Sequence, residues 1–169
     1  SEWARERVLA IAEARRYPVI SSHTNTGGFW TASDLRRLFA LGGYASARID
    51  SAEKLPGVIL GYRRYASPNR YLGVGLGTDT GGFNELPGPS ADNPLPYPFR
   101  PYRGHVVFSR QQTGTRTYDL NKDGVAHYGL IPDLLAKVQT EPHGREALAT
   151  LFHSAEAYLE TWQRAVASR

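Results

Sequence analysis

Two polar residues in the 169-residue chain lie at the ends of short runs that are typical of β-strands. His23 comes after residues 19–22, and Asp79 follows the glycine-rich run 71–77 by two residues. A neutral imidazole is a ligand for divalent metals, and an aspartate beside such a metal can accept a proton from an attacking water. His23 and Asp79 are therefore candidate metal ligands, and Asp79 is also the candidate catalytic base. The structural alternative is a hydrogen-bonded histidine at a strand end and an aspartate that caps a helix or loop.

The elements that would position these residues alternate between strand and helix. Short connections of this kind imply right-handed crossovers and a parallel sheet, in which functional side chains gather at the carboxyl ends of the strands. Hydrophobic periodicity and capping residues predict strands over 19–23, 43–47 and 71–77, and helices over 2–16, from Thr31 or Ser33 to about 41, and over 57–66. The first helix carries Ala4, Val8, Ile11 and Ala12 on one side.

The second half of the chain departs from this alternation. Residues 80–127 form a predicted insertion, which begins with a stretch rich in Gly, Pro and Asn and includes a hairpin between 105–108 and 115–118. Closing helices are predicted over 132–166, the first of them opened by Pro132. Apolar residues repeat at helical spacing in the last predicted helix: Leu148, Leu151, Phe152, Ala155, Tyr158, Leu159 and Trp162.

Composition excludes several classes of function. The 20 basic residues are scattered, so the net charge of +4 does not predict nucleic-acid binding. The chain has no cysteine, which excludes disulfides, thiolate zinc sites and cysteine nucleophiles but leaves the compartment open. No apolar run has the length of a membrane span, and we expect a soluble protein, cytoplasmic or secreted.

Other residues form weaker candidate sites. Residues 119–124 (DLNKDG) match the first half of an EF-hand calcium loop, but Leu130 stands where the loop needs a bidentate glutamate, and a turn held by Asx side chains is the alternative. Ser1 is a possible N-terminal nucleophile, although a helix follows it at once.

Three residues are candidates for contacts with a substrate: Asn25, His127 and Tyr128. His127 also has a structural interpretation. An aromatic set could line a substrate pocket or simply pack the loops, and it consists of Phe29, Trp30, Tyr97, Phe99 and Tyr102.

Four segments, in this order and spacing, resemble the membrane dipeptidases, the renal-dipeptidase-like branch of the metal-dependent amidohydrolase superfamily. They are PVISSHTN (18–25), ALGGY (40–44), GVGLGTDTGG (73–82) and YGLIPDL (128–134). The resemblance implies the C-terminal portion of a TIM-like (β/α)8 barrel, about strands six to eight with their helices. It also implies one or two divalent metals, commonly zinc, and hydrolysis of an amide such as a dipeptide. His23 would bind metal after strand six, and Asp79 would be the carboxylate after strand eight.

The chain departs from the family pattern in three respects. The family's other metal ligands lie on earlier strands that have no counterpart here, no arginine for a substrate carboxylate occurs in 25–34, and the insertion after the last strand is long. We therefore expect a complementary N-terminal half of the barrel, from the same precursor, to complete the metal site, and we expect the chain alone to be neither stable nor active. The alternative is a non-catalytic, barrel-derived subunit or binding module.

Overall fold

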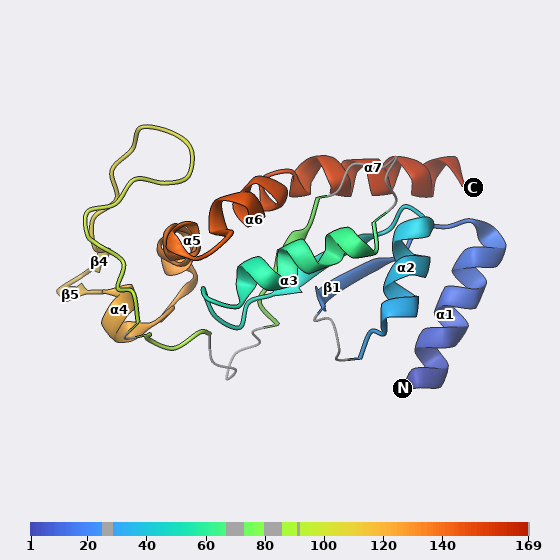
Figure 1. Cartoon of the computed structure of the whole chain (residues 1–169), viewed down its shortest axis with the longest axis horizontal. Helices are drawn as coiled ribbons and strands as arrows, with labels where there is room; N and C mark the ends of the chain where they lie inside the picture. The colour runs from blue at the N-terminus through green and yellow to red at the C-terminus, as the bar shows by residue number, and fades with distance from the viewer. Residues whose placement is uncertain (25–28, 67–72, 80–85, 91, 169) are drawn as a thin grey trace.

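The core of the fold is a parallel sheet of three strands. The computed structural model describes residues 1–24, 29–66, 73–79, 86–90 and 92–168 (Figure 1). β1 (Ile20–Thr24), β2 (Tyr44–Arg48) and β3 (Gly75–Gly77) lie in that order, with Ile20 opposite Tyr44 and Arg48 opposite Gly77. The predicted parallel α/β arrangement is confirmed, since each strand is joined to the next by a helical connection. Residues 71 and 72 of the third predicted strand lie outside the described part.

The helices agree with most of the predicted ranges. α1 (Glu2–Arg15) precedes the sheet, and α2 (Ala32–Ala40) begins after Thr31, whose side chain accepts a hydrogen bond from the Asp34 N–H. α3 (Leu55–Gly61) continues into a 3-10 turn, η1 (Tyr62–Arg64). In the second half, α4 (Leu120–Asp123) and a 3-10 turn, η2 (Tyr128–Leu130), lead into α5 (Ile131–Thr140), α6 (Gly144–Leu151) and α7 (Ser154–Ala167).

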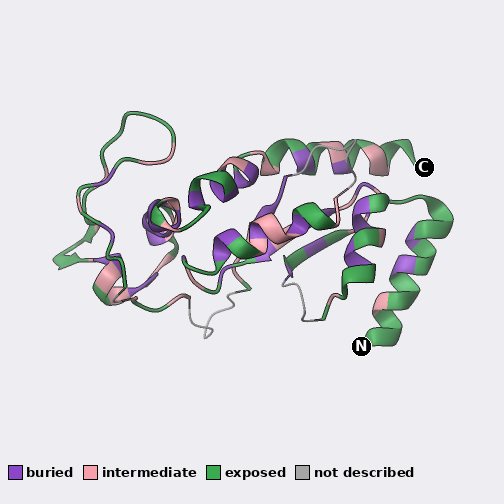
Figure 2. Ribbon diagram, viewed as in Figure 1, coloured by how far each residue is buried: buried purple, intermediate pink, exposed green. Residues whose placement is uncertain are grey.

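One buried apolar cluster joins the sheet to the helices. Fully buried side chains come from α2, β2, α3, η1, α5 and α6, and they include Leu35, Leu38, Ala47, Ile59, Tyr62, Val138 and Leu148. Burial of this kind is the main favourable contribution to folding. Figure 2 shows purple, buried stretches on these central elements and long green, exposed stretches on α1 and α7.

The end of the chain forms two helices where one was predicted. α6 ends at Leu151 and α7 begins at Ser154, with Phe152 and His153 between them. Gly73 lies against this junction so closely that a Cβ on it would collide with the His153 carbonyl and the Ala157 side chain. The apolar residues predicted for one helix therefore separate: Leu148 is buried in α6, whereas α7 exposes Tyr158, Leu159, Trp162 and Val166.

The strands of the predicted hairpin, 105–108 and 115–118, do not pair with each other as predicted. The turn at Thr113–Gly114 is present, but it joins the two-residue strands β4 (Gln112–Thr113) and β5 (Arg116–Thr117). Phe108 instead pairs with Phe99, through two backbone hydrogen bonds of 2.9 Å and a stacked ring contact. The Phe99–Phe108 pairing is favoured over a longer hairpin, because burying the two rings against each other removes more apolar area from water than extending an exposed hairpin would.

Residues 92–99, in the first part of the insertion, are fastened to α4 and α5 by hydrogen bonds. The Asn121 side chain bonds to both the N–H and the carbonyl of Leu95, at 2.8 and 2.9 Å. The Tyr97 hydroxyl donates to the Asp133 carboxylate over 2.5 Å and accepts from the Leu120 N–H. Burial raises the pKa of Asp133, which is 1% exposed. These bonds make 92–99 part of the folded body.

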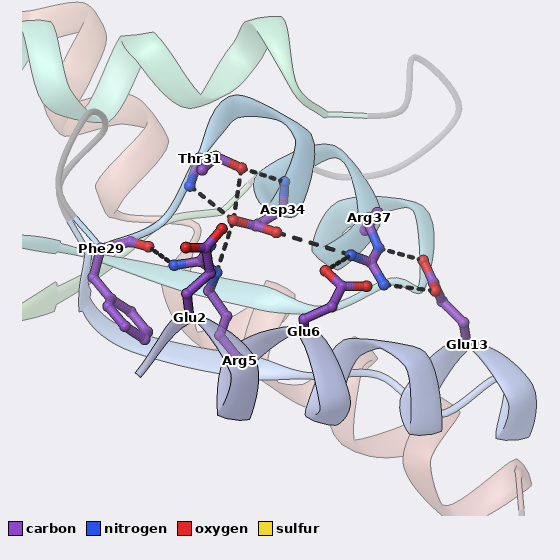
Figure 3. A network of polar contacts seen from close by, with 8 residues as sticks. All are labelled: Glu2, Arg5, Glu6, Glu13, Phe29, Thr31, Asp34 and Arg37. Atoms are coloured by element: carbon purple, nitrogen blue, oxygen red, sulfur yellow. Dashed lines mark hydrogen bonds and ion pairs between the residues drawn. The ribbon is translucent and has the colours of Figure 1, made fainter.

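α1 is held to α2 mainly by charged groups (Figure 3). Arg37 of α2 contacts Glu6 at 2.6 Å and Glu13 at 2.7 Å on α1, while Arg5 of α1 contacts Asp34 of α2 at 2.9 Å. These pairs decide which side of α1 faces the protein. The predicted apolar side is consequently wrong in part: Ala4, Val8 and Ile11 are exposed, whereas Ala12 is buried as predicted, together with Leu9.

We predict that Asp34→Ala lowers the free energy of unfolding by about 2–4 kcal/mol, because it removes a capping box and the nearest carboxylate to the largely buried Arg5 guanidinium. Asp34 accepts from the Thr31 N–H and hydroxyl and is 4% exposed. Glu2→Ala is the matched control, since Glu2 is 89% exposed and 4.0 Å from Arg5, and it should cost less than about 1 kcal/mol. Urea denaturation of both variants measures the difference, and equal losses would contradict the prediction.

A second ion pair connects α5 to the segment after β2. The ammonium of Lys137, a residue only 3% exposed, lies 2.9 Å from the Glu53 carboxylate and donates to the Asp92 carbonyl at 3.0 Å. Partial burial alone would raise the pKa of Glu53, but hydrogen bonds from Lys137, its own backbone N–H, Ser51 and Ser90 outweigh that effect. Together they lower the pKa to about 2.

We predict that the stabilisation from Glu53 is complete above about pH 5 and disappears as the pH falls from 4.5 through 2, because the folded protein holds Glu53 ionised below its unfolded pKa. Glu53→Gln should cost about 1–2 kcal/mol at pH 7, less than a fully buried pair because the Glu53 side chain is 37% exposed. Urea denaturation at pH 7, 5 and 3 should show the difference from wild type shrinking. If the free energy of unfolding lost in Glu53→Gln were the same at all three pH values, the prediction would be contradicted.

Candidate functional site

His23 and Asp79 meet at the carboxyl edge of the sheet. His23 lies in β1, and Asp79 follows β3, the strand on the other side of β2. The His23 Nε2 atom is 3.5 Å from the Asp79 Oδ1 atom, and both side chains are 44% exposed. The sequence predicts that these two residues share one edge, and the structure brings them into direct contact.

Both residues have left-handed backbone conformations. The φ angle is 37° for His23 and 53° for Asp79. Such angles are uncommon outside glycine, although Asn, Asp and His adopt them most readily, and they recur where a site requires a particular side-chain direction. Here the turn of the backbone at each strand end directs the two side chains toward each other.

A glycine in β3 makes this approach possible. A Cβ on Gly77 would lie 2.7 Å from the His23 backbone nitrogen and 3.0 Å from its Cα. Any larger residue at this position would push β3 away from the end of β1. The glycine-rich character of 73–77 thus has a specific steric cause at Gly77.

Ser22 orients the imidazole ring. Its Oγ lies 2.9 Å from His23 Nδ1, which leaves Nε2 directed to Asp79. If Nδ1 carries the proton and donates it to Ser22, Nε2 presents a lone pair, which is the tautomer that a metal requires.

The distance between His23 Nε2 and Asp79 Oδ1 fits a divalent metal that both atoms would bind. Ligand atoms about 2.0–2.1 Å from a tetrahedral zinc are separated by roughly 3.4 Å, close to the 3.5 Å between Nε2 and Oδ1. Two ligands do not complete such a site, since catalytic zinc takes three from the protein. The described residues contain no group of three or more His, Cys, Asp or Glu side chains placed to hold a metal.

Two of the other predicted substrate residues, His127 and Tyr128, lie elsewhere in the described part of the chain. Asn25 lies outside the described residues. His127 lies in the region of α4 and η2, where its ring meets Tyr118 edge-on at 4.6 Å and its Nδ1 accepts from the Gly129 N–H. His127 therefore caps the 3-10 turn that Tyr128 begins, while the Tyr128 side chain is 57% exposed. In Figure 1 that region lies to the left of the strands.

Residues 119–124, the candidate calcium loop, form the structural alternative, a turn stabilised by Asx side chains. Asp119 caps α4 through a 3.0 Å hydrogen bond from the Asn121 N–H and pairs with Arg110 at 2.7 Å. Asp123 accepts from the Asp119 N–H, and the Asn121 side chain bonds to Leu95. The three side chains thus serve separate backbone groups and do not surround one point.

Ser1 and most of the aromatic set also have structural roles. Ser1 caps α1 by accepting from the Ala4 N–H at 3.4 Å. Tyr97 and Phe99 pack against each other beside α5, and Tyr102 stacks on Phe152. Phe29 lies under the Arg5 guanidinium, at 4.8 Å.

Sequence reasoning missed the polar residues that follow the middle strand. Arg48 ends β2 opposite Gly77 and pairs with Asp50 at 3.2 Å. The Ile49 N–H donates to the Gly77 carbonyl, which fixes this segment beside the start of the Asp79 turn. The rule that selected His23 and Asp79, polar residues after a parallel strand, applies equally to Arg48 and Asp50.

Comparisons of the chain with protein-family models, with curated proteins and with solved structures find no match. Among the described residues, no helix combines the length and the apolar character that crossing a membrane requires.

We predict that Gly77→Ala disrupts the His23–Asp79 pair and lowers the free energy of unfolding by about 1–3 kcal/mol, because the new methyl group would overlap the His23 backbone. Gly57→Ala is the matched control: a Cβ there meets nothing within 4 Å, and alanine in α3 should stabilise by about 0.5–1 kcal/mol. Denaturation gives the energies, and the NMR shifts of the His23 ring report the pair. Unchanged ring shifts in Gly77→Ala would refute the steric argument.

Proposed function

We propose that the chain is part of a metal-dependent hydrolase that cleaves an amide or peptide bond, with His23 and Asp79 in its metal centre. The observation that carries the proposal is the 3.5 Å approach of His23 Nε2 to Asp79 Oδ1 at the carboxyl edge of a parallel sheet. Sites in parallel α/β folds form at this edge. The four segments that resemble membrane dipeptidases supply the reaction class.

The two residues would have different roles. His23, oriented by Ser22, would hold a divalent ion, and zinc is the metal that its imidazole and the 3.5 Å spacing suit best. Such an ion, when bound, polarises a carbonyl and acidifies water. Asp79 would be a further ligand and would take the proton from the attacking water, since its carboxylate is accessible and adjacent.

Completion of the site would come from further strands. β1 and β3 are the outer strands of the described sheet, and a closed barrel needs eight. Ile20 of β1 is 51% exposed, and α7 exposes four large apolar residues along one side. Such surfaces are typical of an interface. We propose that the complementary N-terminal half of a TIM-like barrel, from the same precursor, covers them and adds the missing metal ligands.

A second candidate function is a non-catalytic, barrel-derived subunit or binding module. Two observations favour it. The described residues offer no three-ligand metal group, and residues 25–34 of the sequence contain no arginine for a substrate carboxylate. Metal content separates the candidates: elemental analysis of the intact protein should find one or two divalent ions per barrel for the hydrolase, and none for the binding module.

We predict that Asp79→Asn in the complete protein lowers kcat for dipeptide hydrolysis by about 10²–10⁴-fold while the fold remains, because asparagine cannot accept the proton. Glu156→Gln, an exposed acid in the first turn of α7, is the matched control and should keep full activity. Circular dichroism verifies folding. Activity retained in a folded Asp79→Asn variant would exclude the proposed role.

A further inference from the structure

A pocket distinct from the His23–Asp79 pair lies between the segment after β2, the start of the insertion, α4 and α5. Its volume is about 400 Å³, within the range of small-molecule sites. Four residues of its apolar lining are buried: Ala52, Leu120, Val125 and Leu134. Its polar lining includes Asp50, Ser51, Glu53, Ser90, Asp92 and Lys137.

Hydrogen bonds hold the segment of the insertion that lines this pocket at two points, Pro87 and Asp92. The Val125 N–H donates to the Pro87 carbonyl at 2.8 Å, and Lys137 donates to the Asp92 carbonyl at 3.0 Å. Gly124, with a φ of 63°, lies so close to Gly88 that a Cβ would collide with it. The described wall residues are thus held in place before any ligand arrives, which lowers the entropic cost of binding.

The charges in the pocket favour a cation. Lys137 is the basic residue of its lining, and its buried ammonium is already bonded to Glu53 and to the Asp92 carbonyl. Glu53 is likewise saturated by its donors. The carboxylates of Asp50 and Asp92 remain toward solvent. Asp50 pairs with Arg48, whereas the exposed Asp92 side chain has no hydrogen bond or ion pair within the described part of the chain.

The apolar lining favours an organic cation over a metal ion. Four buried aliphatic side chains offer no ligand atoms, and the described residues provide no group of three metal-binding side chains here. We infer that this pocket binds a small primary ammonium compound, with its apolar part against Leu120, Val125 and Leu134 and its ammonium at Asp92. This inference does not depend on the proposed hydrolase function.

The test is a matched set of three probes: phenethylammonium, 2-phenylethanol and 3-phenylpropionate. Each is titrated into the isotopically labelled protein in the assembly state in which it purifies, and amide NMR shifts are followed. The ammonium should produce saturable shifts at residues 52, 90, 120, 125, 134 and 137, with a millimolar or lower Kd. The alcohol should bind at least about fivefold more weakly, as loss of one exposed charge pair predicts, and the carboxylate not at all.

Two variants locate the site. Asp92→Asn should weaken ammonium binding about fivefold, whereas Glu156→Gln, which removes an equal charge far along the chain in α7, should leave it unchanged. Gly88→Leu should weaken ammonium binding by adding a bulky side chain to the pocket lining, since a Cβ at Gly88 meets nothing within 4 Å and the fold should tolerate the change. Gly57→Leu controls for the added bulk.

Three results would overturn the inference. They are the absence of saturable shifts at the pocket residues, equal affinity for the ammonium and the carboxylate, and unchanged affinity in either Asp92→Asn or Gly88→Leu. None of these results bears on turnover by Asp79→Asn, so failure here leaves the hydrolase proposal untouched. Conversely, a metal-free and inactive protein that binds phenethylammonium at these residues would retain this inference.

Discussion

Parallel pairing of β1, β2 and β3 directs all three carboxyl ends to one edge of the sheet, and the candidate site residues lie along that edge. His23 lies near the end of one outer strand and Asp79 follows the other, while Arg48 ends the middle strand and Asp50 comes just after it. The segment after the middle strand then forms one wall of the pocket. One topological constraint therefore places both candidate sites, because each polar residue that follows a parallel strand lies at the same edge of the sheet.

The second half of the chain is organised around polar anchors in buried positions. Tyr97 and Asp133, Asn121 and Leu95, and Lys137 and Glu53 each connect the insertion, or the segment after β2, to α4 or α5. Buried polar groups are costly unless they are satisfied, so such pairs favour one arrangement over its alternatives. They allow a long, proline-rich segment to form the rigid wall of a pocket with few secondary-structure elements of its own.

The sequence predicted the order of strands and helices well, but it predicted the packing of side chains less well. Alternation of short apolar runs with helical segments predicted the parallel sheet, and Thr31 predicted the start of α2. The strand ends alone predicted that His23 and Asp79 lie at one edge, and the structure adds their direct contact. The errors arose where distant residues decide the outcome. Ion pairs with α2 determine which side of α1 faces the protein, and Gly73 packs against the break between α6 and α7. Phe108 pairs with Phe99, so it is not part of the hairpin that the sequence predicted.

The site could be predicted only in part for a similar reason. The pocket combines residues from four segments between positions 50 and 137, and no local spacing reports their proximity. The steric role of Gly77 is equally invisible in sequence, because it depends on the backbone of a strand more than fifty residues earlier.

The attachment of α1 has a consequence for cooperativity. Its contact with the body buries just two of its apolar residues, Leu9 and Ala12, and otherwise relies on ion pairs that salt screens. The central helices, by contrast, share one continuous apolar cluster. α1 is therefore suited to act as a separate foldon, opening at a lower free energy than the sheet and exchanging its amide hydrogens while the core stays closed. The pair at the sheet edge would persist through such openings.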